Sequence, residues 1–242
     1  MSRVLLVANW KMNMTRVEAR AYAGDLGSRI GDSSGRAELV LAPPYTALDA
    51  ARDPRGRWAL AAQNLSDQRA GAFTGEVSGA MIAEAGCRYV IVGHSERRTL
   101  FGEDGPLLAR KLARAREAGL IPIYCVGETA RERAAGSTRE TLAGQARALA
   151  DDPEDQPLVV AYEPVWAIGT GLAATPADSA DAATDLRTLL AGRRDLRILY
   201  GGSVNPGNAR GLLGNGGIDG FLVGGASLQA ATFAALAEAA SA

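Results

Sequence analysis

Residues 158–171 read LVVAYEPVWAIGTG and place a carboxylate, Glu163, directly after a short apolar run. Runs of about 4–8 residues rich in Val, Leu and Ile are typical of strands buried in a parallel sheet. In parallel α/β enzymes, the reactive side chains collect at the carboxyl ends of the strands. The stretch therefore predicts a buried strand that delivers Glu163 to the working face of an enzyme.

Similar apolar runs recur along the chain, with helical patterns between them. The eight predicted strands are Val4–Ala8, Glu38–Ala42, Trp58–Gln63, Tyr89–Gly93, Ile121–Val126, Leu158–Tyr162, Arg197–Tyr200 and Gly220–Val223. Strands that alternate with helices indicate βαβ units and a parallel sheet. An open doubly wound sheet is the alternative, but the GxGxxG fingerprint is missing after the first run. We predict an α/β fold, a (β/α)8 barrel made by one domain over residues 1–242.

Capping signals mark several of the expected helices. Thr15 with Glu18 is a capping box that opens a helix, and Gly119 is placed to end another one. Two further pairs have the pattern of an N-cap residue followed by proline at the first helical position. They are Thr175-Pro176 and Asn205-Pro206.

Composition and charge exclude several classes of partner. The chain has 242 residues, which suits a single α/β barrel, and a formal charge of -1. No polybasic tract occurs, so we expect neither nucleic acid nor an anionic membrane as a partner. No apolar run approaches the length of a membrane span, and the first run is too short for a signal peptide.

The cysteines and the histidine bear on location and on metals. Cys87 and Cys125 form no CxxC pair, which favours a reduced cytoplasm without disulfides. A single histidine and the absence of clustered thiols argue against a zinc site. We therefore expect a cytoplasmic protein with no metal and no cofactor.

Glu163 precedes a stretch that is unusually apolar for a loop. Val165, Trp166 and Ile168 suit a lid that closes over a site and excludes water. A partly desolvated carboxylate there would have its pKa raised toward that of a useful general base. The alternative is a glutamate paired at the barrel rim, with the loop simply packed down.

His94 is the only histidine and opens the segment HSERR after a predicted strand. If a helical turn begins there, its free N–H groups disfavour the protonated ring. A neutral imidazole could then donate a hydrogen bond to a carbonyl oxygen. The alternative is a capping or core histidine. Residues 96–98 are all charged. We interpret them as an ion-pair cluster that orients this loop, in preference to a catalytic role.

Lys11 follows the first strand, in the string NWKMN. At a barrel mouth it could pair with a phosphate or with a developing enolate, although most lysines are solvated surface charges. Asn9 could hydrogen-bond a substrate oxygen or the lysine, or merely satisfy a turn.

Two glycine-rich turns follow the last two predicted strands, in residues 200–209 and 219–227. Glycines let backbone N–H groups approach a phosphate closely, and a helix N-terminus adds a favourable field. In barrels the phosphate site commonly lies after the last two strands. A further long polar stretch, Gln63–Ser78, has an aromatic residue at its tip and is typical of a functional or interaction loop.

Six strings together resemble the triosephosphate isomerase family in order and spacing, over essentially the whole chain. They are NWKMN, VGHSERR, CVGE, AYEPVWAIGTG, YGGSVNP and DGFLVGGASL. The resemblance implies a metal-free isomerase that interconverts D-glyceraldehyde 3-phosphate and dihydroxyacetone phosphate through an enediolate, in glycolysis and gluconeogenesis.

The same resemblance implies a role for each candidate residue. Glu163 is the expected base, His94 the electrophile, and Lys11 with Asn9 the pair that binds substrate and stabilises the enediolate. The expected phosphate-binding groups are the backbones of Gly169, Ser203, Gly224 and Gly225. Residues 164 to about 174 are the expected lid.

The resemblance also implies a homodimer. Loop Gln63–Ser78 would insert into a second copy, with Thr74 near the partner's Lys11 and the partner's His94. One position departs from the family, because Leu172 stands where many members have lysine. Two rival functions remain open: the same chemistry on a longer sugar phosphate, such as a tetrulose phosphate, and non-catalytic phosphate binding on the same scaffold.

Overall fold

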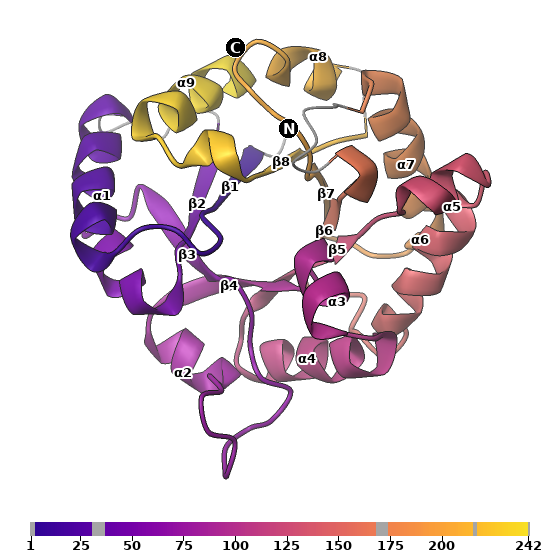
Figure 1. The fold of residues 1–242 in the computed structure, drawn as a ribbon, viewed down its shortest axis with the longest axis horizontal. Helices are drawn as coiled ribbons and strands as arrows, with labels where there is room; N and C mark the ends of the chain where they lie inside the picture. The colour runs from indigo at the N-terminus through magenta and orange to yellow at the C-terminus, as the bar shows by residue number, and fades with distance from the viewer. Residues whose placement is uncertain (1–2, 31–36, 168–173, 215–216, 242) are drawn as a thin grey trace.

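The structure is a computed structural model that describes residues 3–30, 37–167, 174–214 and 217–241. Eight parallel strands form a closed barrel in which each strand pairs with the next and β8 pairs with β1. Figure 1 looks down this barrel and shows the helices as a ring around it. The open doubly wound sheet is excluded, and the (β/α)8 barrel is confirmed.

The strands occur where the apolar runs predict them, to within two residues at either end. They are β1 (Val4–Asn9), β2 (Ala37–Ala42), β3 (Trp58–Ala62), β4 (Cys87–Val92), β5 (Ile121–Val126), β6 (Leu158–Tyr162), β7 (Leu196–Tyr200) and β8 (Gly220–Val223). Gly93 falls outside β4, because its φ of 72° is left-handed and turns the chain out of the sheet.

Helices connect the strands, and short 3-10 turns add to several of the connections. The α-helices are α1 (Arg16–Ile30), α2 (Gly79–Glu84), α3 (Ser95–Phe101), α4 (Gly105–Glu117), α5 (Ala130–Ala134), α6 (Thr138–Ala146), α7 (Pro176–Leu189), α8 (Ala209–Gly214) and α9 (Ala230–Ser241). The 3-10 turns are η1 (Tyr45–Ala47), η2 (Asp49–Ala51), η3 (Arg147–Leu149), η4 (Val165–Ala167) and η5 (Gly225–Ser227).

Most of the capping signals are confirmed. Thr15 and Glu18 form the reciprocal bonds of a capping box, and Thr175 caps α7 with proline next to it. Gly119 adopts a φ of 71° and follows α4 in the pattern of a Schellman motif. The helix start predicted at Asn205-Pro206 is wrong, since α8 begins at Ala209. Asn205 Oδ1 instead accepts from the N–H groups of the two residues before α8 and caps a turn.

Side chains from three strands close the amino-terminal end of the barrel. Arg197 of β7 donates to the Glu38 carboxylate of β2 at 2.7 Å and to the Tyr89 hydroxyl of β4 at 3.1 Å. The Tyr89 hydroxyl donates to Glu38 at 2.6 Å, so both members of this half-buried ion pair have further polar partners. Beyond it the barrel interior is apolar, with Leu5 and Ile91 among its buried residues. Polar side chains come together again at the other end of the barrel, where the carboxyl ends of the strands lie.

The loop Gln63–Ser78 projects from the barrel beside α2 (Figure 1). Its base is closed by a bond from the Ser66 N–H to the Val77 carbonyl oxygen, 2.8 Å long. At its tip Phe73 is 45% exposed, which is a large apolar side chain in water. Among the described residues, no helix is both long enough and apolar enough to cross a membrane.

Candidate active site

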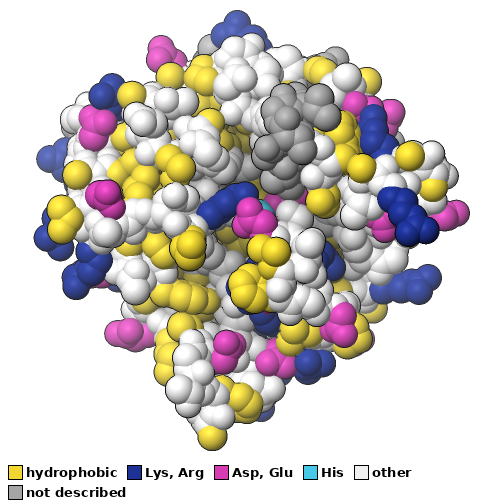
Figure 2. All heavy atoms as spheres, in the orientation of Figure 1, with side chains coloured by type: hydrophobic (Ala, Val, Ile, Leu, Met, Phe, Trp, Pro, Cys, Tyr) yellow, Lys and Arg dark blue, Asp and Glu magenta, His cyan; other side chains and the backbone are white. Residues whose placement is uncertain are grey.

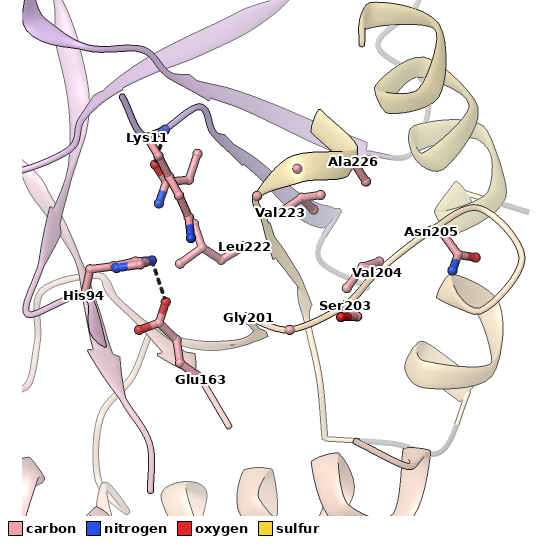
Figure 3. Close-up of a pocket in the computed structure, with 14 residues that line it drawn as sticks. Lys11, His94, Glu163, Gly201, Ser203, Val204, Asn205, Leu222, Val223 and Ala226 are labelled. Carbon is pink, nitrogen blue, oxygen red and sulfur yellow. Dashed lines mark hydrogen bonds and ion pairs between the residues drawn. The ribbon is translucent and has the colours of Figure 1, made fainter. Parts of the chain in front are cut away.

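One pocket at the carboxyl ends of the strands brings together nearly all of the predicted site residues. It has a volume of about 320 Å³ and is lined by Asn9, Lys11, His94, Glu163, Gly201–Asn205 and Leu222–Ala226. Figure 3 shows Lys11, His94 and Glu163 on one side and Ser203 with its neighbours on the other. In Figure 2 the single histidine is visible at the centre of this face, next to dark-blue and magenta side chains.

Glu163 and His94 are buried and hydrogen-bonded to each other. His94 Nε2 lies 3.0 Å from Glu163 Oε1, and the Ser95 N–H donates to Glu163 Oε2 at 2.8 Å. His94 is the N-cap of α3, and its Nδ1 accepts from the Glu96 N–H at 3.2 Å. A ring nitrogen that accepts carries no proton, so the proton of a neutral imidazole is on Nε2.

The pKa of Glu163 lies below its ordinary value. Burial raises it, but His94 and the Ser95 N–H together lower it by more. The prediction of a raised pKa is therefore wrong for this structure. It considered desolvation alone, whereas the partners that stabilise the anion come from a segment 68 residues earlier in the chain.

The pKa of His94 lies above its ordinary value. Burial lowers it, but the carboxylate of Glu163, assisted by Glu96, outweighs burial. The prediction that the helix N-terminus keeps this ring neutral omitted the carboxylate and is wrong in direction. In either protonation state Nε2 carries a hydrogen, so His94 can donate from this atom at any pH.

Burial and the Glu163 carboxylate have opposite effects on the pKa of His94. We expect a titration of the single imidazole by NMR, in wild type and in a variant, to distinguish them. In the wild type its pKa should lie above the reference of about 6.5. In Glu163→Gln it should fall, because burial continues to lower it while its main negative partner is gone. An unchanged imidazole pKa in the variant would contradict this assignment.

Lys11 is held in a strained backbone conformation, with a φ of 53°. A positive φ is uncommon for a residue with a side chain and persists where the surroundings enforce it. Here Asn9 Oδ1 accepts from the Lys11 N–H at 3.0 Å, and Gln63 Nε2 donates to the Lys11 carbonyl oxygen at 2.8 Å. The Asn9 side chain thus closes a turn onto the backbone of Lys11, which agrees with two of the alternatives left open for it, and Gln63 was missed as a brace.

The ammonium of Lys11 forms an ion pair with Glu96, 2.5 Å from Nζ to Oε1. The sequence assigned Glu96 to a structural cluster, which left out its contact with Lys11. The rest of that cluster does brace the loop: Arg98 donates to the carbonyl oxygens of Gly93 and Cys125 at 2.8 Å each. Glu96 therefore links the lysine to the loop that carries His94.

A close backbone approach fixes the position of Glu163. A Cβ atom at Gly127 would lie 1.7 Å from the Glu163 carbonyl oxygen, so only glycine fits there. The Glu163 N–H also donates to the Val126 carbonyl oxygen at 2.7 Å. The glycine of the string CVGE therefore lets the chain after β5 lie directly against the backbone of Glu163, after β6. This contact is visible only in the folded barrel.

The glycine-rich turns after β7 and β8 form the other side of the pocket. Gly224 and Gly225 lie where η5 begins, and no described residue accepts a hydrogen bond from either N–H. Asn208 Nδ2 donates to the Ser203 carbonyl oxygen at 3.0 Å and fixes the first turn. Such backbone groups can bind a phosphate. Gly169, the fourth predicted phosphate contact, lies outside the described residues.

The start of the predicted lid packs against a buried carboxylate. Trp166 Nε1 donates to Glu128 Oε1 at 2.8 Å, and the Val165 N–H donates to the Glu128 carbonyl oxygen at 3.1 Å. The Arg133 guanidinium lies over the Trp166 ring at 4.2 Å. Residues 168–173 of the predicted lid, with Leu172, lie outside the described residues.

The site combines a carboxylate, a hydrogen-bond donor, a cation and backbone N–H groups in one pocket. This set can move a proton next to a carbonyl and stabilise the resulting oxyanion. Within the described part of the chain, no three His, Cys, Asp or Glu side chains are grouped as metal ligands.

Known proteins match the chain over nearly its whole length. The triosephosphate isomerase family model matches residues 4–240. The triosephosphate isomerase of Rubrobacter xylanophilus is 46% identical over 249 residues, which cover 98% of this chain and 97% of that protein. The triosephosphate isomerase of Alcanivorax borkumensis is 46% identical over 99% of this chain and 100% of its own. That of Chloroflexus aurantiacus is 48% identical over 95% and 96%.

Fold, site and relatives define an isomerase enzyme built on a (β/α)8 barrel. The chain belongs to the triosephosphate isomerase family.

Proposed function

We propose that this protein interconverts D-glyceraldehyde 3-phosphate and dihydroxyacetone phosphate in glycolysis and gluconeogenesis. The observation that carries the proposal is a single pocket in which Glu163, His94 and Lys11 face two glycine-rich turns. Proton transfer next to a carbonyl needs a base, an electrophile and a counter-charge, and these three side chains supply them.

Glu163 is the proposed base. In the structure its carboxylate is held by His94 and by the Ser95 N–H. A substrate carbonyl that accepts the hydrogen bond of His94 Nε2 displaces the carboxylate from that donor. Burial then dominates and raises the pKa of Glu163, so the base strengthens once substrate is in place. It takes a proton from one carbon and returns it to the neighbouring one, while the hydroxyl proton passes from one substrate oxygen to the other, so that the carbonyl and hydroxyl groups exchange places.

His94 and Lys11 are the proposed stabilisers of the enediolate. Nε2 donates to the substrate oxygens, and the Lys11 ammonium opposes the negative charge that develops on them. Asn9 keeps the lysine in its strained conformation. Ser203, Gly224 and Gly225, together with Gly169, are the proposed phosphate contacts.

Assays with triose and tetrulose phosphates test the proposal directly. The proposed function predicts rapid conversion of the triose phosphates and a much lower kcat/KM for tetrulose phosphates. Preference for the longer sugar would reassign the substrate. Phosphate binding without any turnover would leave only the non-catalytic alternative.

We propose further that the chain is one domain over residues 1–242, acts in the cytoplasm and forms a homodimer. The support for the dimer is loop Gln63–Ser78, which projects from the barrel and ends in exposed Phe73 and Thr74. Other large apolar side chains are also exposed, among them Met12 at 95% and Met81 at 58%. Phe73 and Met81 line one small surface pocket, and contiguous exposed apolar surface is typical of a protein interface.

Shortening the loop should give monomers of low activity. Because Ser66 and Val77 already close its base, residues 68–75 can be replaced by two glycines with little effect on the barrel. Without the loop, the partner's Lys11 and the partner's His94 would lose a brace. Size-exclusion chromatography and an activity assay on the same sample make the measurement. A monomeric variant with full activity would contradict the proposed arrangement.

A further inference from the structure

The turn after β8 is tied to helix α1 by a tyrosine that lies outside the pocket. The Tyr22 hydroxyl donates to the Ser227 carbonyl oxygen at 2.8 Å, and the two residues are 205 positions apart. Both residues are buried. We propose that Tyr22 is a positioning residue for phosphate binding, an inference that rests on the proposed function of Gly224 and Gly225.

Ser227 transmits this contact to the proposed phosphate site. Its hydroxyl lies 2.7 Å from the Gly224 carbonyl oxygen and 3.0 Å from the Val223 carbonyl oxygen, and its single proton is shared between these two acceptors. Its N–H donates to the Gly224 carbonyl oxygen at 2.8 Å. Ser227 is therefore fixed to the end of β8, and its own carbonyl is fixed to Tyr22. The turn η5, beside Val223 in Figure 3, is held at both ends.

A fixed turn matters here because of the backbone of Gly224. Its φ of −87° and ψ of −112° lie outside the regions that residues with a Cβ atom favour. The directions of the Gly224 and Gly225 N–H groups depend on this conformation. Hydrogen bonds lose strength steeply as they depart from good alignment, so a small rotation of η5 weakens phosphate binding.

The tyrosine ring is itself fixed, so its hydroxyl cannot turn away from Ser227. It packs edge-on against Trp10, with ring centroids 4.7 Å apart and an interplanar angle of 65°. Burial raises the pKa of Tyr22, so the hydroxyl keeps its proton and remains a donor. Trp10 directly precedes Lys11. Through its contact with Trp10 and its hydrogen bond to Ser227, Tyr22 therefore connects the segment of Lys11 to η5.

Tyr22→Phe tests the inference, because it keeps the ring and removes only the hydroxyl. Loss of one buried hydrogen bond leaves the Ser227 carbonyl without its partner. We expect kcat/KM for glyceraldehyde 3-phosphate to fall roughly 3–10-fold, mainly through KM, while phosphate-free glyceraldehyde changes by less than about 2-fold. Ser227→Ala should give the same selective loss, because it removes the bonds on the other side of the turn.

Tyr124→Phe is the matched control. Its hydroxyl also donates to a backbone carbonyl, that of Gln145 at 2.7 Å, and accepts from Arg98 of the His94 loop at 3.1 Å, so any effect on activity should reach both substrates equally. This variant should be destabilised to a similar extent, with an unchanged ratio of activity between the two substrates. Thermal melting of all three variants gives the stability comparison.

Titration calorimetry with inorganic phosphate separates this inference from the proposed function. Weaker phosphate binding to Tyr22→Phe than to wild type supports positioning by Tyr22 even if neither protein turns over triose phosphate. Equal losses for the phosphorylated and phosphate-free substrates, or unchanged phosphate binding, would show that Tyr22 serves stability alone.

Discussion

Replacing Glu163 by glutamine should lower kcat by at least about 10²–10⁴-fold, the usual effect of losing a general base. The amide keeps the size of the side chain and cannot accept a proton from carbon. Phosphate binding should change little, because the proposed phosphate contacts are backbone groups of the turns after β7 and β8 and not the Glu163 carboxylate. Steady-state kinetics and a titration with inorganic phosphate measure the two effects separately.

Glu38→Gln provides the control for a neutralised, largely buried carboxylate. Glu38 lies at the amino-terminal end of the barrel and pairs with Arg197. Loss of the negative charge should lower the free energy of unfolding by about 3 kcal/mol, because the largely buried guanidinium loses its counter-charge. Turnover should stay close to that of wild type. Near-normal turnover in Glu163→Gln would remove this residue from the role of base.

Removing the phosphate from the substrate should have a comparably large effect. Three charge-assisted hydrogen bonds, each of roughly 1.5–3 kcal/mol, correspond to a loss on the order of 10³–10⁶-fold in kcat/KM. We take these bonds to come from Ser203, Gly224 and Gly225. Binding energy from this remote group also supports closure over the reacting carbons, so kcat itself should fall.

The comparison of glyceraldehyde with and without its phosphate measures this loss. Added inorganic phosphate occupies the glycine-rich turns and should inhibit the phosphorylated substrate competitively. A planar enediolate mimic that carries a phosphate should bind far more tightly than inorganic phosphate. Equal kcat for the two forms of glyceraldehyde would mean that the turns are not a phosphate site.

The sequence predicts the barrel and the location of the site well, because both follow from local patterns. Short apolar runs mark the strands, and the residue after each run lies at the carboxyl end of the barrel. Lys11, His94 and Glu163 could therefore be placed in one pocket without coordinates. Asn205-Pro206 shows the limit of such patterns. An asparagine followed by proline can cap a turn as well as a helix, and here it caps a turn.

The electrostatics of the site could not be predicted, because it depends on contacts between distant segments. The sequence shows that Glu163 is desolvated and that His94 starts a helix, but not that the two lie 3.0 Å apart. This contact reverses the expected direction of both pKa shifts. The pairing of Lys11 with Glu96 and the contact of Tyr22 with Ser227 likewise join segments that are remote in the chain.

Isomerisation in deuterated water tests the central claim, that Glu163 carries a proton between two carbons. A carboxylate that holds the proton at the pocket can exchange it with solvent before returning it. The account predicts that product formed from dihydroxyacetone phosphate contains deuterium at the carbon that receives the proton, and that Glu163→Gln forms such product at a greatly reduced rate. Full conversion with no deuterium in the product, at the same rate in wild type and in Glu163→Gln, would indicate direct hydrogen transfer between the carbons and would contradict the account.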